Sequence, residues 1–344
     1  MIRPSSPLTM LLSRHTRRRE FVQIIAAGVV LSPLGLRAQQ GNRPRSIGVL
    51  FAMAPSDPEA QIRVKAFEAA LQDLGWTEGK NVRLEYHWAP HDGDLLRKHA
   101  KELVGSSPDV ILATSTPVVT ALATENRLPI VFVQVMDPIG NGFVHNLARP
   151  GGNLTGFTNF EFTVGSKWLE ALKHVAPEVR RVALLFNPDT APYAHLFWKP
   201  VQEAARSFDV EVTQLPARDT VEFTEVIEAF ARQTNGGLMI LPDVSTANYR
   251  DLIIELAARH RLPAVYPYRY FALSGGLLSY GPDLADVYRR AASYVDRILK
   301  GAAPGDLPVQ APSKFEMVIN LKTANAMGLT IPPLVLGRAD EVIE

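Results

Sequence analysis

The chain has 344 residues, which is enough for two domains of ordinary size, each with its own core. Hydrophobic residues make up 47% and charged residues 21%, a balance typical of soluble globular folds that excludes both a disordered chain and a membrane bundle. Cysteine is absent, which excludes disulfides, thiolate metal sites, a cysteine nucleophile and a lipid-anchoring cysteine. The chain holds 36 basic and 35 acidic residues. Residues 1–38 contain 6 of the basic residues and 1 of the acidic ones, so the remaining 30 basic and 34 acidic residues give the rest of the chain a net charge of −4. A mildly acidic body disfavours a nucleic-acid partner.

The first 38 residues have the order of an export signal. A basic region ends in Arg17-Arg18-Arg19, an uncharged and mostly apolar stretch covers 24–36, and the small residue Ala38 follows. As a helix this stretch spans only about 20 Å, which is less than the ~30 Å hydrocarbon core of a bilayer. The arginine pair before Glu20 resembles the twin-arginine export signal, and a general secretory signal with an arginine-rich start is the alternative. We expect export to the periplasm, with removal of the signal near Ala38.

Strand and helix patterns alternate from residue 47 to residue 135. Short apolar or alternating runs predict strands, and apolar residues at helical spacing predict the helices between them. The predicted strands cover 47–51, 82–88, 110–113 and 130–135, and the predicted helices cover 62–74, 95–104 and 116–126. This alternation predicts a parallel sheet covered on both faces by helices.

The same plan then begins again, because the sequence repeats. The segment Arg45 to Phe51 returns 135 positions later as Arg180 to Phe186, and Arg127-Leu128-Pro129 returns 134 positions later as Arg261-Leu262-Pro263. In the second unit the predicted strands cover 182–186, 210–215 and 238–241, and the predicted helices cover 197–208, 223–233 and 249–260. Two α/β units of this size predict two lobes that face each other across a ligand cleft.

The tail lies outside the repeat. An amphipathic helix is predicted over 284–299, followed by a proline-rich link over 303–312, a last strand over 315–319 and a short helix that ends at Met327. We expect this tail to cross between the lobes and to form part of the hinge. The predicted fold is therefore α/β, with two doubly wound parallel-sheet lobes joined by a hinge. The first lobe comprises 39–160 and about 282–312, and the second comprises 161–281 and about 313–344.

Two turns at the carboxyl ends of strands occupy equivalent positions in the two units. They are 114–117 in the first and 242–246 in the second. Loops at this edge of a parallel sheet line the ligand crevice. Ser115 and Thr116 begin a helix, whose free N–H groups and dipole suit a ligand carboxylate, and an ordinary helix cap is the alternative. Asp243 suits a ligand ammonium or hydroxyl group, and a purely local role in the turn is the alternative.

Further candidate ligand contacts lie in other loops near the predicted cleft. Asp137 stands before a proline at the end of the strand predicted over 130–135. Tyr193 belongs to an aromatic cluster that follows the strand predicted over 182–186, and Tyr266 belongs to one that follows Arg261-Leu262-Pro263, where the fourth strand of the second unit is expected. Such rings with polar tips suit a small amphipathic ligand. Packing in the core or hinge is the alternative for these aromatic residues. The remaining candidates are Thr158, Asn187 and Ser245.

Signatures of enzymes and metal sites are missing from the sequence. His87 and His91 have the spacing of a helical metal pair, but they span a strand end and a turn containing Pro90, so they would not share a helix face. The chain lacks a phosphate loop of the form G-x-x-x-x-G-K-[ST], a dinucleotide turn G-x-G-x-x-G and a nucleophile elbow G-x-S-x-G. We therefore expect no catalytic residue, no metal and no cofactor.

Several segments carry a resemblance to a known family. They are Leu74-Gly75-Trp76, Gly79-Lys80-Asn81-Val82, Asp137-Pro138, Arg149-Pro150-Gly151-Gly152-Asn153-Leu154-Thr155-Gly156 and Phe315-Glu316-Met317-Val318-Ile319-Asn320-Leu321-Lys322-Thr323-Ala324. From Ile47 onward the chain resembles the solute-binding proteins of bacterial ABC transporters, in the branch that includes tryptophan and tyrosine binders. The resemblance implies the type I periplasmic-binding-protein fold.

The resemblance also implies a function and partners. The protein would close on a small solute, an amino acid or a small carboxylate, and hand it as a monomer to a membrane permease whose ATPase is a separate polypeptide. A sensor of the same fold that presents the solute to a receptor is the alternative, and an enzyme built on two α/β lobes is a further one. A ligand-responsive repressor would need a helix-turn-helix before the first lobe, where the sequence has the export signal instead.

Overall fold

The computed structural model of the chain describes residues 43–90, 92–123 and 127–344. The predicted export signal lies outside the described residues, as do His91 and the predicted end of the helix over 116–126. Residues Arg45 to Glu344 form one compact unit. In the part of the chain that the structure describes, no helix has both the length and the apolar character needed to cross a bilayer.

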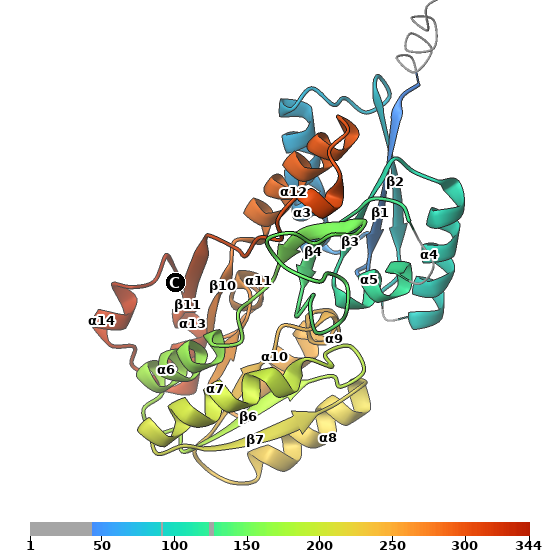
Figure 1. Cartoon of the computed structure of the whole chain (residues 1–344). Helices are drawn as coiled ribbons and strands as arrows, with labels where there is room; N and C mark the ends of the chain where they lie inside the picture. Colours follow the sequence, from blue (N-terminus) through green and yellow to red (C-terminus); the bar gives the residue numbers. More distant parts are fainter. Residues whose placement is uncertain (1–42, 91, 124–126) are drawn as a thin grey trace, which may run out of the picture. The chain divides into compact units, whose positions relative to one another are not determined.

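The first half of the chain forms a five-stranded parallel sheet with the order β2-β1-β3-β4-β5 (Figure 1). Its strands are β1 (Arg45–Phe51), β2 (Val82–Trp88), β3 (Val110–Thr114), β4 (Ile130–Val135) and β5 (Leu154–Thr158). The helices between the strands are α3 (Pro58–Asp73), α4 (Gly93–Ser106) and α5 (Thr116–Ala123). The predicted strands and helices of this part are confirmed, with shifts of a few residues at their ends.

Alternation along β1 explains how both faces of this sheet are covered. Ile47, Val49 and Phe51 belong to a core with α3 and with α12 (Leu284–Leu299), whereas Leu50 belongs to a core with α4 and α5. In sequence, helix α12 lies between two strands of the second sheet, but it packs against α3 of the first, as Figure 1 shows. On the other face Gly48 is required by close packing, because a Cβ atom there would lie 2.4 Å from Leu103 Cδ1.

The second half forms a seven-stranded sheet with the order β12-β11-β10-β9-β8-β6-β7. Its strands are β6 (Arg181–Phe186), β7 (Glu211–Pro216), β8 (Gly236–Ile240), β9 (Ala264–Tyr266), β10 (Leu278–Pro282), β11 (Phe315–Asn320) and β12 (Glu341–Ile343). All pairings in this sheet are parallel except that of β10 with β11. The predicted all-parallel arrangement is therefore corrected at this one pair, because the tail returns beside β10 in the opposite direction.

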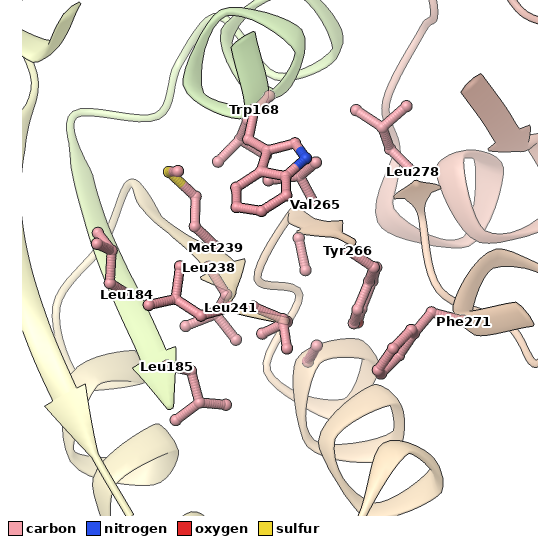
Figure 2. Packing of buried hydrophobic residues seen from close by; sticks show 14 of the residues in the cluster. Trp168, Leu184, Leu185, Leu238, Met239, Leu241, Val265, Tyr266, Phe271 and Leu278 are labelled. Atoms are coloured by element: carbon pink, nitrogen blue, oxygen red, sulfur yellow. The ribbon is translucent and has the colours of Figure 1, made fainter. Parts of the chain in front are cut away.

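Helices cover the second sheet as well. They are α6 (Val164–Val175), α7 (Ala194–Ser207), α8 (Thr220–Ala231), α9 (Val244–Asn248), α10 (Arg250–Arg259), α11 (Arg269–Leu273), α13 (Leu321–Met327) and α14 (Pro333–Leu336), and the 3-10 turn η1 (Pro304–Asp306) lies in the proline-rich link. Figure 2 shows part of the core of this lobe, where the Trp168 ring of α6 lies beside Met239 of β8 and Val265 of β9. The rings of Tyr266 and Phe271 stack in the same core with centroids 5.0 Å apart.

The sequence repeat corresponds to a repeat of topology. The order β2-β1-β3-β4 in the first sheet matches β7-β6-β8-β9 in the second, so the repeated segments 45–51 and 180–186 include β1 and β6, the second strand of each series. Arg127-Leu128-Pro129 and Arg261-Leu262-Pro263 directly precede the equivalent strands β4 and β9. The fold class of two α/β lobes is thus confirmed. The exact lobe boundaries remain a prediction.

Candidate ligand-binding site

A cavity lies where the loops at the carboxyl ends of the strands of both sheets meet. It has an empty volume of about 480 Å³, part of it open to solvent. The first lobe contributes Met53, Arg63, Thr114, Ser115, Thr116, Pro117, Gln134 and Asn159, and the second contributes Tyr193, Pro242, Asp243, Val244, Ala247, Tyr268 and Tyr270. This is the edge at which open α/β sheets bind ligands.

Arg63 is the most unusual of these residues, because it is a buried cation that forms no ion pair, although Glu59 on the same helix acts on it electrostatically from further away. It projects from α3, is only 4% exposed, and has no carboxylate within 4.0 Å among the described residues. Its Nη1 contacts Met53 Sδ at 2.9 Å and Gln134 Oε1 at 3.4 Å. Its Nε and Nη2 have no hydrogen-bond partner. These two nitrogens form one edge of the guanidinium, the edge that binds a carboxylate with two parallel hydrogen bonds.

The Tyr270 ring offsets part of the cost of this buried charge. The Arg63 Cζ atom lies 5.6 Å from the centroid of that ring, which comes from the second lobe. A cation over an aromatic face is stabilised by about 0.5–2 kcal/mol, much less than the cost of burying an unpaired ion. An anionic group of a ligand would therefore be the main partner of the Arg63 side chain.

Ser115 adds a second unpartnered polar group to the cavity. Its hydroxyl oxygen is buried and makes no hydrogen bond. The residue has a φ of 132°, a conformation that non-glycine residues rarely adopt, and Gln134 in the same cavity has a φ of 57°. Strain of this kind persists where the surroundings fix the backbone, as they often do at binding sites. The Thr116 hydroxyl, in contrast, accepts a hydrogen bond from Met136 N at 3.1 Å and so anchors the start of α5.

Asn159 provides an acceptor in the same cavity. Its Nδ2 donates to the hydroxyl of Tyr268 at 2.5 Å, which links the end of the first lobe to the second. Its Oδ1 is buried and has no partner. Burial raises the pKa of Tyr268 to about 12, so its hydroxyl stays protonated at neutral pH. The cavity thus combines unpartnered donors on Arg63 with an unpartnered acceptor on Asn159.

Asp243 lies in the cavity wall but is engaged by the protein itself. One carboxylate oxygen accepts from Thr190 Oγ1 at 2.5 Å and from Ser245 N at 3.0 Å, and the other accepts from Asn187 N at 2.9 Å. Burial raises its pKa to about 6, and the hydrogen bonds oppose that shift. These contacts fix the loop after β8 against the loop after β6. The carboxylate caps α9 at the same time.

The structure places the other predicted residues in different surroundings. Tyr193 lines the cavity, and its hydroxyl donates a hydrogen bond to Pro242 O at 2.6 Å. Asn187 and Ser245 do not line the cavity, and Asn187 Nδ2 donates a hydrogen bond to Ser245 Oγ at 3.1 Å. Tyr266 lies in the core of the second lobe. Thr158 Oγ1 donates to Gln310 O in the link between the lobes at 3.4 Å, and Asp137 accepts from Gly140 N in its own turn at 2.9 Å.

Of the predicted residues, the structure therefore brings Ser115, Thr116, Tyr193 and Asp243 together in the cavity. The sequence analysis missed Arg63, Gln134, Asn159, Tyr268 and Tyr270, which lie in the same wall. Tyr268 and Tyr270 belong to the aromatic cluster that contains Tyr266, so the sequence offered a signal for them. Arg63 gave no such signal, because it stands between Ile62 and Val64 with Lys65 nearby, a pattern typical of a solvated helix face. Its burial depends on contacts with residues distant in sequence.

Comparison with known proteins agrees with this architecture. Residues 47–343 match a family model described as ABC transporter substrate binding protein. A curated relative, a tyrosine-binding protein of Clostridioides difficile, is 23% identical over 289 residues, which cover 84% of this chain and 82% of that protein.

Two solved structures share the fold. A conserved domain protein of Vibrio cholerae has a TM-score of 0.81 and 26% identity, over 87% of this chain and all (100%) of that one. A Streptococcus pneumoniae ABC domain in complex with L-Trp has a TM-score of 0.80 and 24% identity, over 88% of this chain and 100% of that one. The type I periplasmic-binding-protein fold that the resemblance implied is thereby confirmed.

Proposed function

We propose that this chain, which belongs to the ABC transporter substrate-binding protein family, captures an amino acid with an aromatic side chain in the cavity between its lobes. Members of this family bind small solutes and work with permease and ATPase components. The proposal rests above all on Arg63, whose buried guanidinium has an unpartnered edge that fits a carboxylate.

The polar groups of the cavity match the two ends of an α-amino acid. The ligand carboxylate would accept two hydrogen bonds from Arg63 Nε and Nη2, with the Ser115 hydroxyl beside it. The ligand ammonium would donate to Asn159 Oδ1, the buried acceptor without a partner. Each of these groups is costly to bury unpaired, so a ligand that pairs all of them gains affinity and selectivity.

The remaining lining supports an aromatic ligand side chain. Tyr193, Tyr268 and Tyr270 present aromatic surface, and Met53, Val244 and Ala247 present aliphatic surface. Such a lining favours a flat and largely apolar group. The names of the compared proteins, one tyrosine-binding and one in complex with L-Trp, point to the same class of solute.

The binding experiment compares ligands that differ only in the carboxylate. L-tryptophan and tryptamine are titrated into the wild-type protein and into Arg63→Met by calorimetry, with the other amino acids and simple sugars tested alongside. We expect L-tryptophan or L-tyrosine to bind the wild type, and tryptamine to bind more weakly by about 2–5 kcal/mol, the usual effect of removing one partner of a buried charge pair. Arg63→Met should lose that discrimination.

Two controls separate a ligand contact from a folding defect. Arg83→Met removes an arginine whose side chain is 65% exposed on β2, and it should change neither ligand affinity nor stability. In the absence of ligand, the unfolding temperature of Arg63→Met should equal or exceed that of the wild type, because the substitution removes an unpaired buried charge. Equal affinity of the wild type for tryptophan and tryptamine would refute the role of Arg63, and tight binding of a sugar alone would refute the amino-acid proposal.

The proposal includes export. We propose that residues 1–38 direct the chain to the periplasm by the twin-arginine route, that the signal is removed near Ala38, and that the mature protein acts as a monomer. The arginine run and the apolar stretch behind it support this. Replacing Arg18 and Arg19 with lysine should leave the precursor in the cytoplasm, and normal export of that variant would favour the general secretory route.

A further inference from the structure

Two histidines and a glutamate meet on the first lobe, at residues that do not line the ligand cavity. His87 lies on β2, which is one of the two edge strands of its sheet, and His99 and Glu102 lie one turn apart on α4. His87 Nδ1 is 3.2 Å from His99 Nδ1 and 4.0 Å from Glu102 Oε2, and His99 Nδ1 is 3.0 Å from Glu102 Oε2. Among the described residues this is the one group of His, Cys, Asp and Glu side chains arranged to hold a metal ion.

A fourth residue orients one of the imidazoles. Glu85 is two positions before His87 on the same face of β2, and its Oε1 lies 3.0 Å from His87 Nε2. With the proton on Nε2 donated to this carboxylate, His87 Nδ1 carries a free lone pair directed toward His99 and Glu102. Metal-binding histidines are commonly held by a carboxylate in this way, which fixes the tautomer and makes the free nitrogen a better ligand.

We propose that His87, His99 and Glu102 bind one divalent transition-metal ion, with zinc as the expected metal and Glu85 as the carboxylate that orients His87. The three ligand atoms form a triangle whose centre lies about 2.0 Å from each of them, close to the usual zinc–nitrogen and zinc–oxygen distances. The Glu102 side chain is 46% exposed and can adjust toward tetrahedral geometry, and water can take the fourth position.

The donor set decides the class of metal. Two imidazoles with one carboxylate suit zinc and its neighbours, whereas calcium and magnesium prefer sites built from oxygen alone. The sequence places His87 near His91 and predicts no metal, because local spacing does not show that α4 packs beside β2. A bound ion would clamp the edge strand to the helix.

The test uses the mature chain after treatment with a chelator and dialysis. Zinc chloride is titrated by calorimetry, and cobalt(II) is added in a parallel experiment to monitor the visible bands of tetrahedral coordination. We expect one zinc per chain, at least tenfold weaker binding in His87→Ala and in His99→Ala, and loss of the tetrahedral cobalt spectrum in both. Glu85→Gln should weaken zinc binding about 10- to 100-fold, as loss of an orienting carboxylate does in other sites.

Matched controls keep the result specific to this cluster. His195→Ala removes an exposed histidine at the start of α7 and should bind zinc like the wild type. Zinc should raise the unfolding temperature of the wild type and of His195→Ala, but not that of the double variant His87→Ala/His99→Ala. Unchanged zinc affinity in that double variant, or absence of binding to the wild type at micromolar zinc, would overturn the proposal. Because the cluster is separate from the cavity, amino-acid binding should be the same in all these variants, so this test is independent of the proposed function.

Discussion

Asp243 gives a prediction about pH at the scale of one residue. Its folded-state pKa is about 6 against an ordinary value of 3.8, because burial disfavours the charged form. Between these values the folded protein holds the proton more tightly than the unfolded chain. The contribution of Asp243 to the free energy of unfolding is therefore greatest below about pH 4. As the pH rises from about 4 through 6, this contribution falls by up to about 3 kcal/mol.

Urea denaturation of the wild type and of Asp243→Asn at several pH values between 4 and 7.5 tests this prediction. The difference in unfolding free energy between the two proteins should move in favour of the asparagine variant as the pH rises, while all other titrating groups cancel. The variant carries a constant penalty, because its amide nitrogen cannot accept from Asn187 N. A difference that stays constant over this range would show that Asp243 titrates near its ordinary pKa.

The residues of the cavity differ in how far their positions could be predicted from the sequence. Ser115, Thr116 and Asp243 could be predicted, because each lies within three residues of the end of a buried strand and the carboxyl ends of parallel strands define the crevice. Arg63 and Asn159 could not, since the first lies within a helix and the second follows β5, a strand without a clear pattern in the sequence. Their importance comes from atoms left unpartnered by the tertiary structure, which no local pattern records.

At the scale of elements, an ion pair joins the start of α10 in the second lobe to the start of α3 in the first. Arg250 Nη1 lies 2.8 Å from Asp57 Oδ2, and both side chains are largely buried. Asp57 also caps α3 by accepting from Glu59 N at 2.9 Å, and Asn248 Nδ2 donates to Ala52 O at 3.2 Å beside this pair. None of these five residues lines the cavity. Contacts of this kind stabilise the arrangement in which the lobes touch.

We therefore predict that Arg250→Ala weakens ligand binding without touching the ligand. The Arg250–Asp57 pair forms across the lobes, so both charges regain water when the lobes separate, and the net contribution of the pair to closure is about 1 kcal/mol. The dissociation constant for the amino acid should therefore rise about fivefold as the closed state becomes less populated. Calorimetry with L-tryptophan measures this. Arg259→Ala at the other end of α10 is the matched control, because that side chain is 54% exposed and pairs only with glutamates of its own lobe.

Asp57→Asn extends the test of this pair. Asparagine keeps the helix cap but removes the charge, so it should weaken binding like Arg250→Ala, and the double variant should be no weaker than either single one. Additive losses in the double variant would mean that the two residues act independently and would refute the interlobe pair.

Some elements escaped prediction for identifiable reasons. Strand β5 contains Gly156, which resembles a turn residue, but the structure shows that a Cβ atom there would lie 2.0 Å from Phe132 O, so the glycine allows close contact with β4. Strand β9 is only 3 residues long and too short to carry a periodic signal. Strand β12 depends on pairing with β11, which brings the end of the chain to the edge of the sheet.

At the scale of the whole molecule, the chain passes between the two sheets three times. These passages lie between β5 and α6, between β10 and α12, and between α12 and β11. Thr158 N donates to Gln310 O at 2.9 Å, so the first and third passages are hydrogen-bonded side by side. Hinges that are few and adjacent allow two lobes to rotate as rigid bodies. The sequence repeat predicted the two lobes. In the tail, α12 packs against α3 of the first lobe and β11 joins the sheet of the second.

Closure on the ligand is the prediction that belongs to this scale. Arg63 and Asn159 come from the first lobe, and Tyr193, Tyr268 and Tyr270 from the second, so a ligand that contacts both sets binds the closed arrangement more tightly than an open one. A ligand shifts a conformational equilibrium only by this differential affinity.

In small-angle scattering, saturating L-tryptophan should therefore reduce the radius of gyration of the wild type. Arg250→Ala without ligand should have a larger radius than the wild type, because the interlobe ion pair is lost. Arg63→Met should not contract at the same tryptophan concentration. A wild-type radius that stays the same with and without saturating ligand would refute closure, even if the ligand binds in the cavity.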